Sequence, residues 1–234
     1  MQPARPLAAR LRRRARGVAA DAIHEAWRLA GVIGAVGPDD ARGRRFAAMG
    51  HGSCIAFPPG AVFGERLISI GASTLIGPNV SLAVGMHPDE PLQVPGGVVI
   101  RIGDRCVIGR GVSIIGRCSI EIEDDVTTGP NVYITDHNHS YEDLTIPIGR
   151  QWPAEDPVRI GAGSWLGTGV VVLPGATIGR HVTVAAGSVV RGTIPDRAVV
   201  AGVPAKIVRR HVDGEGWVPS LRRQVATPDW WVVT

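Results

Sequence analysis

The sequence predicts a mainly β fold, a solenoid of six-residue repeats with an amphipathic helix before it and a tail after it. Three observations predict this fold. Aliphatic residues return at every sixth position from about residue 68 to residue 195, and most are followed by glycine. Glycine is abundant (31 of 234 residues) and aromatic residues are only 5%, so the core must consist of aliphatic side chains. Apolar residues also recur at helical spacing near the N-terminus.

Residues 1–45 are predicted to be a basic helical segment. Within residues 5–36 the apolar positions at helical spacing are Leu7, Leu11, Ala15, Val18, Ala22, Ala26, Leu29, Ile33 and Val36. Ten arginines against four acidic residues make this segment strongly basic, whereas the whole chain carries only +4. The rest of the chain is therefore slightly acidic, which argues against a nucleic-acid partner because such a partner needs a basic folded surface.

Two interpretations of this helix stay open. It could pack within its own oligomer with solvated arginines, or it could make weak contact with an anionic membrane surface. A signal peptide is disfavoured because the apolar stretch Leu29–Gly37 comes late and follows Asp21 and Glu25. The sequence contains no run of 18 apolar residues, so no membrane span is predicted.

Residues 46–210 are the predicted repeat domain. Its clear units begin at Ile70, Ile76, Ile102, Ile108, Ile114, Ile122 and Thr128, and then at Ile160, Leu166, Val172, Ile178, Val184 and Val190. Each unit is expected to form a short strand and a tight turn, with glycine allowing the turn dihedral angles. Because one unit cannot bury its inward face alone, the units must stack. A two-residue slip breaks the frame just before Ile122.

The three cysteines, Cys54, Cys106 and Cys118, are too few for a disulfide framework, and no pair has the CxxC spacing. This usage favours a reduced, cytoplasmic setting. Cys106 and Cys118 both occupy the small fifth place of a repeat unit. We therefore expect both to fill the interior and not to act as ligands or redox groups.

Two loops, residues 86–98 and 138–157, interrupt the repeat, and their flanking segments look like copies. Gly77–Val80 leads to His87 at the start of the first loop, and Gly129–Val132 leads to His137 directly before the second. Long loops that leave a rigid repeat body commonly carry function. The second loop is the stronger candidate because it is longer and precedes an uninterrupted run of repeats.

Two motifs resemble a known family. Thr135-Asp136-His137-Asn138-His139-Ser140-Tyr141, followed by Ile146-Pro147-Ile148, resembles the loop motif of the hexapeptide-repeat O-acyltransferases. Gly202-Val203-Pro204-Ala205-Lys206 resembles the segment that ends the β-helix in galactoside and maltose acetyltransferases. The resemblance covers residues 65–210. It implies a left-handed parallel β-helix of five to six coils and a homotrimer with its sites between subunits.

The same resemblance implies a coenzyme A-dependent O-acyltransferase, most simply an acetyltransferase, that acts on a hydroxyl of a sugar or glycan. Its co-substrate would be acyl-CoA, and no metal is expected. Four alternatives stay open: transfer of a longer acyl chain, an amine acceptor, a metal-dependent hydratase like carbonic anhydrase, and a scaffold without activity. Neither the acceptor nor the acyl length follows from the sequence.

Acyl transfer to a hydroxyl needs a base because the neutral oxygen is a poor nucleophile, and histidine suits this role. The resemblance assigns the general base to His137. His139 could orient the acceptor or His137, or it could cap the loop. Asp136 could orient the base, but on a strand it would point to the opposite face from His137. As metal ligands, these three would need a further histidine, which the sequence does not place.

The resemblance also implies the acyl-CoA contacts, which fall on Trp165, Thr168, Ala186, Arg191, Lys206 and Arg209. The family's Thr-Lys pair is Arg191-Gly192 here, so one cation is displaced by one residue. No residue matches the asparagine that contacts sugar in the galactoside enzymes, which argues against a galactoside acceptor. Residues 211–234 form a tail in which Trp217, Trp230 and Trp231 predict that it folds back onto the body.

Overall fold

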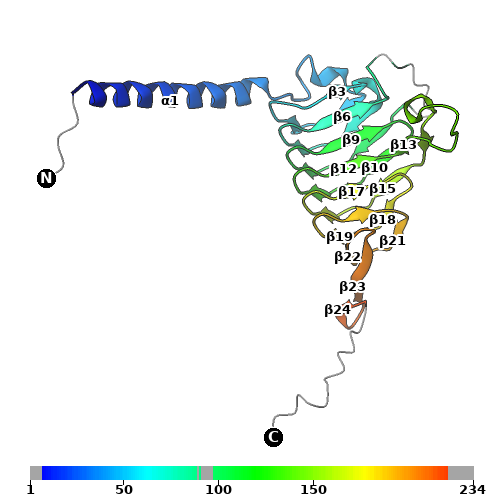
Figure 1. Ribbon diagram of the computed structural model, residues 1–234. Coiled ribbons are helices and arrows are strands. Elements are labelled where there is room, and N and C mark those ends of the chain that lie inside the picture. The colour runs from blue at the N-terminus through cyan, green and yellow to red at the C-terminus, as the bar shows by residue number, and fades with distance from the viewer. Residues whose placement is uncertain (1–6, 89, 91–96, 221–234) are drawn as a thin grey trace, which may run out of the picture.

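The computed structural model describes the backbone of residues 7–88, 90 and 97–220, and the side chains from residue 13 onward. The described chain is a helix followed by a parallel β-helix with three faces (Figure 1). Three sheets form these faces, and each coil contributes one short strand to each sheet. Among the described residues there are six complete coils, and two strands begin a seventh.

The first sheet consists of β1 (Ala48–Met49), β4 (Ile68–Ile70), β7 (Ile100–Ile102), β10 (Ile120–Ile122), β15 (Val158–Ile160), β18 (Thr177–Ile178) and β21 (Thr193–Ile194). The second consists of β2 (Cys54–Ile55), β5 (Leu75–Ile76), β8 (Val107–Ile108), β11 (Thr127–Thr128), β16 (Trp165–Leu166), β19 (Thr183–Val184) and β22 (Ala198–Ala201). The third consists of β3 (Val62–Phe63), β6 (Ser81–Val84), β9 (Ser113–Gly116), β12 (Tyr133–Thr135), β17 (Val171–Val172) and β20 (Val189–Val190). The first coil therefore begins at Ala48, upstream of the residue at which the repeat becomes regular.

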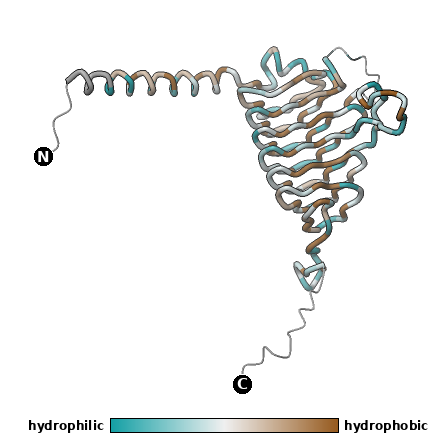
Figure 2. Tube along the Cα trace, in the orientation of Figure 1, coloured by the Kyte–Doolittle hydropathy of each residue, from teal (hydrophilic) through white to brown (hydrophobic). Residues whose placement is uncertain are grey.

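The first residues of the repeat units stack in register and form the core. In the first sheet one continuous column runs through Ile70, Ile102, Ile122, Ile160, Ile178 and Ile194. All six side chains are buried, and Figure 2 shows hydrophobic positions recurring along the strands of every coil. Burial of a whole aliphatic side chain contributes about 1.5–3 kcal/mol, so stacking compensates for strands of only two to four residues.

The fifth place of the unit is inward, as predicted, at Cys106, which is fully buried and whose thiol pKa is raised by burial. At Cys118 the prediction is wrong. This side chain is only half-buried, because the slip in the repeat displaces the turn after β9. All three cysteines are unpaired.

The two interruptions leave the solenoid at the same corner, where the third sheet connects to the first. One lies between β6 and β7 and the other between β12 and β15. The second loop contains a small hairpin of β13 (His137–Asn138) and β14 (Ala154–Glu155). At the opposite edge in Figure 1 the coils are joined by plain turns. The corner with both loops is thus the place where the repeat is elaborated.

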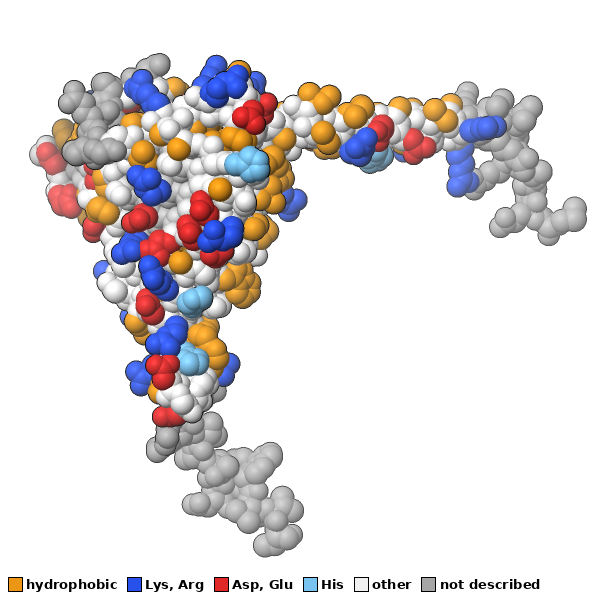
Figure 3. Space-filling view, turned by 180° about the vertical axis from the view of Figure 1, so that it is seen from behind, with side chains coloured by type: hydrophobic (Ala, Val, Ile, Leu, Met, Phe, Trp, Pro, Cys, Tyr) orange, Lys and Arg blue, Asp and Glu red, His pale blue; other side chains and the backbone are white. Residues whose placement is uncertain are grey.

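The helix α1 (Leu7–Gly34) extends away from the solenoid (Figure 1). Trp27 near its end packs on Phe57 with 6.2 Å between ring centroids. Figure 3 shows hydrophobic side chains along one side of the helix and charged ones along the other, and Val18, Val32 and Ile33 are more than 60% exposed. The predicted amphipathic helix is confirmed. Among the described residues, no helix combines the length and apolar character needed to cross a membrane.

The end of the described chain is a hairpin of β23 (Lys206–Val212) and β24 (Gly216–Pro219), which extends the second sheet antiparallel to β22. Trp217 packs edge-on against His211, with 5.6 Å between ring centroids. The predicted folding back of the tail is seen for Trp217 only within this hairpin. Trp230 and Trp231 lie outside the described residues.

Candidate active site

His137 lies in the short strand β13, directly after the third sheet. Its Nδ1 is 3.0 Å from Oδ1 of Asp136 and 3.2 Å from Oγ1 of Thr135. A carboxylate can only accept, so Nδ1 carries the proton and Nε2 keeps a free lone pair. The His137 side chain is 12% exposed and that of Asp136 is fully buried. This arrangement is that of a histidine base oriented by a carboxylate.

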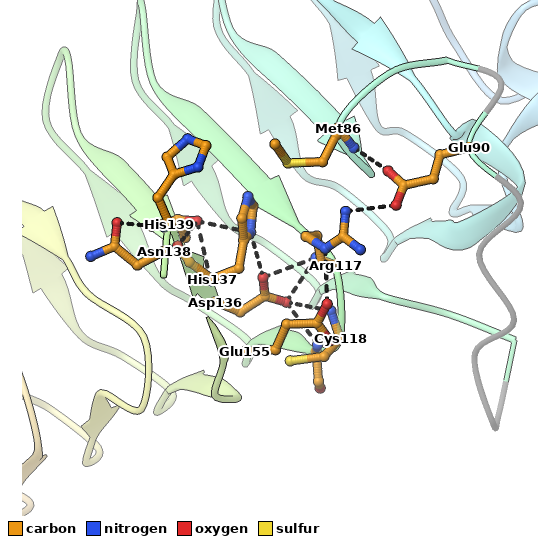
Figure 4. Close-up of polar contacts among 11 residues, drawn as sticks. Met86, Glu90, Arg117, Cys118, Asp136, His137, Asn138, His139 and Glu155 are labelled. Atoms are coloured by element: carbon orange, nitrogen blue, oxygen red, sulfur yellow. Dashed lines mark hydrogen bonds and ion pairs between the residues drawn. The ribbon is translucent and has the colours of Figure 1, made fainter. Parts of the chain in front are cut away.

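Asp136 lies between β12 and β13, not within a strand, so the alternation expected for a strand does not apply. The opposite-face orientation was expected only for a strand residue, and the Asp136 carboxylate instead contacts the imidazole (Figure 4). Three consecutive backbone N–H groups, those of Arg117, Cys118 and Ser119, also donate to it at 2.8–3.0 Å. The backbone of the turn after β9 thus holds the carboxylate in place.

These hydrogen bonds decide the charge of Asp136. Burial alone would raise the pKa of this carboxyl, but the hydrogen bonds from His137 and from the three backbone N–H groups outweigh burial and hold the pKa below its ordinary value. Asp136 is therefore ionised at neutral pH. The same carboxylate and burial raise the pKa of the Cys118 thiol to about 12, burial being the larger cause, so Cys118 stays protonated.

The lowered pKa of Asp136 predicts a pH-dependent contribution to stability. A lowered native pKa stabilises the fold above the unfolded-state value of about 3.9, and this contribution is lost as the pH falls toward the native value. We expect Asp136→Asn to be less stable than the wild type by about 1.5–3 kcal/mol at pH 7, the usual range for hydrogen bonds to a charged group. Unfolding measured between pH 3 and 7 should show this difference shrinking below pH 4. A difference that is constant or grows at low pH would contradict an ionised Asp136.

The loop after His137 is held by its own return strand. His137 pairs with Glu155, Asn138 pairs with Ala154, and the N–H of Asp156 donates to the carbonyl of Asp136 at 2.7 Å. Within the loop, five large apolar side chains are 42–95% exposed, namely Tyr141, Leu144, Ile146, Ile148 and Trp152. Apolar side chains gathered in this way mark a surface that another molecule covers.

His139 is exposed, and among the described residues no hydrogen bond joins its ring to Asp136 or His137 (Figure 4). Within the described part of the chain, no group of three or more His, Cys, Asp or Glu side chains is arranged to hold a metal ion.

The predicted acyl-CoA residues other than Arg191 lie on or beside the second sheet. Trp165 and Arg209 share one column of the second sheet, in which Trp165, Thr183, Val199 and Arg209 are successive register partners. Thr168 and Ala186 follow strands of that sheet in stacked turns, where the N–H of Gly187 donates to the carbonyl of Thr168 at 2.9 Å. Lys206 pairs with Ala201 at the end of the sheet. All except Lys206 and Arg209 belong to regular coils.

Arg191 is separated from these residues. It follows β20 and lies at the corner where the third sheet connects to the first, which is the corner of the histidine loop. The structure thus groups Trp165, Thr168, Ala186, Lys206 and Arg209 on or beside the second sheet, and leaves Arg191 and His137 at another corner. Within the described part of one chain, the predicted base and most of the predicted coenzyme contacts therefore lie at different corners.

Four side chains beside the site were not predicted, those of Arg117, Glu90, Glu155 and Trp152. Arg117 is buried and its Nη1 and Nε pair with Glu90 and Glu155 at 2.7 and 2.8 Å. The guanidinium also lies over the ring of Trp152, 4.8 Å from its centroid. The signal that could have revealed Arg117 is the two-residue slip before Ile122, because Arg117 lies where the repeat leaves its frame.

Comparison with known proteins matches residues 157–192 to the family described as bacterial transferase hexapeptide (six repeats). Residues 99–136 match the hexapeptide repeat of succinyl-transferase. The putative lipopolysaccharide biosynthesis O-acetyl transferase WbbJ of Escherichia coli is 38% identical over 142 residues, which is 58% of this chain and 70% of that protein. A probable acetyltransferase of Mycobacterium tuberculosis is 44% identical over 110 residues, which is 47% of this chain but only 37% of that longer protein.

Among solved structures, the hexapeptide-repeat acetyltransferase of Vibrio cholerae complexed with acetyl coenzyme A is 26% identical with a TM-score of 0.50. The match covers 73% of this chain and 74% of that one. The chain therefore belongs to the hexapeptide-repeat transferase family. Its membership confirms the predicted left-handed parallel β-helix and the predicted enzyme class, the acyltransferases.

Proposed function

We propose that the protein is an acyl-CoA-dependent O-acyltransferase, most simply an acetyltransferase, that acts on a hydroxyl of a sugar or glycan with His137 as general base. The observation that carries this proposal is the Asp136–His137 pair. An ionised, buried carboxylate holds the proton on Nδ1 of His137, which leaves Nε2 to accept a proton from a hydroxyl. The names of the Escherichia coli relative and of the Vibrio cholerae structure support acetyl transfer to a glycan oxygen and acetyl-CoA as donor.

The proposed reaction is a direct transfer. Nε2 of His137 accepts the proton of the acceptor hydroxyl while its oxygen attacks the carbonyl carbon of the thioester. The carbon–sulfur bond then breaks, and protonated His137 returns the proton to the departing sulfur. The products are the acyl ester and free coenzyme A. Asp136 stabilises the protonated imidazole and keeps its ring in one orientation.

The coenzyme is proposed to lie along the second sheet. Trp165 is 52% exposed there and offers an apolar wall for the pantetheine arm. Lys206 and Arg209, both exposed at the end of the sheet, are cations suited to the phosphates of coenzyme A. Thr168 and Ala186 would meet the arm at the corner turns. Arg191, at the other corner, would contact a coenzyme held by a neighbouring subunit.

We propose a homotrimer in which each site lies between two chains. The histidine loop and the coenzyme sheet are at different corners, and the loop exposes five large apolar side chains. Five hollows of about 290 to 500 Å³ in the described part of the chain have linings that do not include His137. A neighbouring subunit that covers the loop would supply the missing wall of the site.

A cytoplasmic location is also part of the proposal, because acyl-CoA would be the donor and all three cysteines are unpaired. The exposed apolar side of α1, with Arg13, Arg14 and Arg16 near its start, would allow weak contact with an anionic membrane surface. An oligomer that buries this side of the helix is the alternative.

The proposed activity predicts release of free coenzyme A thiol that depends on a hydroxyl acceptor. We expect incubation with acetyl-CoA and a panel of sugars, glycans and amino sugars to give thiol release well above the rate without acceptor. Acyl-CoAs of several chain lengths in the same assay define the donor. Release with amino acceptors alone, their hydroxyl analogues remaining inert, would contradict O-acylation. No release with any donor and acceptor would contradict the proposed function.

A further inference from the structure

Arg117 is a buried cation that the proposed reaction does not use directly. It lies in the turn between β9 and β10, and its side chain is 1% exposed. Its Nη1 donates to Glu90 of the first loop, and its Nε donates to Glu155 of the second loop. The face of the guanidinium lies against Trp152. One side chain therefore joins the two loops that interrupt the repeat (Figure 4).

The backbone at Arg117 makes a second connection, to the catalytic pair. The N–H groups of Arg117, Cys118 and Ser119 all donate to the carboxylate of Asp136. The carboxylate in turn contacts Nδ1 of His137. The position of these N–H groups depends on the conformation of the turn, and the side chain of Arg117 anchors that turn to both loops.

Glu155 adds a third connection. It is the register partner of His137 in the β13–β14 hairpin, so the ion pair of Glu155 with Arg117 fixes the strand beside the histidine. The Arg117 side chain and backbone thus hold His137 from two sides. A lysine cannot reproduce this because its single ammonium lacks the planar fork that reaches two carboxylates at once.

We propose that Arg117 is a positioning residue for His137, and that Glu90 connects the first loop to Arg117 and so helps to position the same histidine. This inference rests on the proposed function of His137 as the base. It assigns a role to the first loop, whose own histidine, His87, is exposed. The loop would act through the Glu90–Arg117 ion pair and not through His87. Loss of this pair should displace the base without removing any group that touches the substrates.

The carboxylates around the Arg117 side chain explain why a cation is needed at this position to hold the two loops together. The guanidinium of Arg117 pairs with the carboxylates of Glu90 and Glu155, whereas Asp136 accepts only from the backbone N–H of Arg117. Burial alone would raise the pKa of Glu90, but the hydrogen bond from the Met86 N–H, followed by the hydrogen bond and the charge of Arg117, outweighs burial and holds this pKa below its ordinary value. The Nη2 atom of Arg117 is buried without a partner among the described residues, a cost that the ion pairs on Nη1 and Nε must offset. Without the cation, like charges would separate the loops.

Glu90→Gln tests the role of the Glu90–Arg117 ion pair because it keeps the shape of the Glu90 side chain and removes its charge. Glu123→Gln is the matched control. Its side chain is 14% exposed against 11% for Glu90, and it also pairs with arginines, Arg159 and Arg180, away from His137. We expect Glu90→Gln to lower kcat about ten- to a hundredfold, the cost of a misplaced reacting group, with KM for acyl-CoA unchanged. Glu123→Gln should leave both constants unchanged. Arg117→Lys should lower kcat at least as much as Glu90→Gln.

A second readout does not depend on activity. The Nδ1 proton of His137, held by Asp136, should give a protected NMR signal in the wild type that His137→Ala lacks. We expect this signal to weaken or shift in Glu90→Gln and to stay in place in Glu123→Gln, with both variants folded by circular dichroism. An unchanged signal and unchanged kcat in Glu90→Gln would overturn the inference. If the wild type transfers no acyl group, the proposed function fails, whereas the NMR comparison still decides the positioning role.

Discussion

His137→Ala is expected to reduce turnover by about 10²–10⁴-fold, the usual contribution of a positioned general base. The imidazole is the group in the described site with a free acceptor nitrogen next to an ionised carboxylate. Its removal leaves the acceptor hydroxyl without a partner for its proton. Thiol release at saturating acetyl-CoA and acceptor measures the loss. Binding of coenzyme A, followed by calorimetry, should change little because most of the proposed coenzyme residues lie at another corner.

Two other histidines serve as controls for this variant. His139 is exposed two residues further along the same loop, and His87 is exposed on the first loop. His139→Ala and His87→Ala should each retain most of the turnover. If His87→Ala is the inactive variant and His137→Ala remains active, then the wrong interruption has been assigned to catalysis.

Most of the fold could be predicted because the repeat depends on local rules. A buried aliphatic residue at every sixth position fixes both the strand and its register, as the column from Ile70 to Ile194 shows. The two long loops could be predicted because they break this pattern. The start of the solenoid at Ala48 could not, because the first coil lacks the regular six-residue spacing.

The orientation of Asp136 and the role of Arg117 depend on contacts between distant segments. Asp136 follows the last residue of β12, so the turn after the strand directs its side chain, and the donors that hold it come from residues 117–119. Arg117 is buried because two loops, 27 and 38 residues away in sequence, bring Glu90 and Glu155 to it. These contacts cannot be derived from the spacing of residues in the sequence. The same turn explains why Cys118 is not in the core.

The sequence could not predict where the proposed coenzyme residues lie relative to one another. The resemblance treats Trp165, Thr168, Ala186, Arg191, Lys206 and Arg209 as one set, but the structure places Arg191 at the corner of the histidine loop and the others on or beside the second sheet. In the proposed homotrimer, two chains would combine both corners in one site. The assembly would then determine which of these residues meet.

The shared site predicts that two inactive variants restore each other. His137→Ala removes the base and keeps the coenzyme sheet, whereas Arg209→Ala does the reverse. Each variant alone is expected to be nearly inactive at low acyl-CoA concentration. After mixing in equal amounts and reassembly, about a quarter of the sites in randomly mixed trimers should combine an intact His137 with an intact Arg209.

Thiol release by this mixture, measured after subunit exchange has been demonstrated by mass spectrometry of tagged chains, tests the shared site most directly. The account predicts a rise from the level of the parent variants to about a quarter of the wild-type rate. A mixture of wild-type-sized trimers that remains as inactive as both parents would contradict it. His137 and Arg209 would then have to serve a site within one chain.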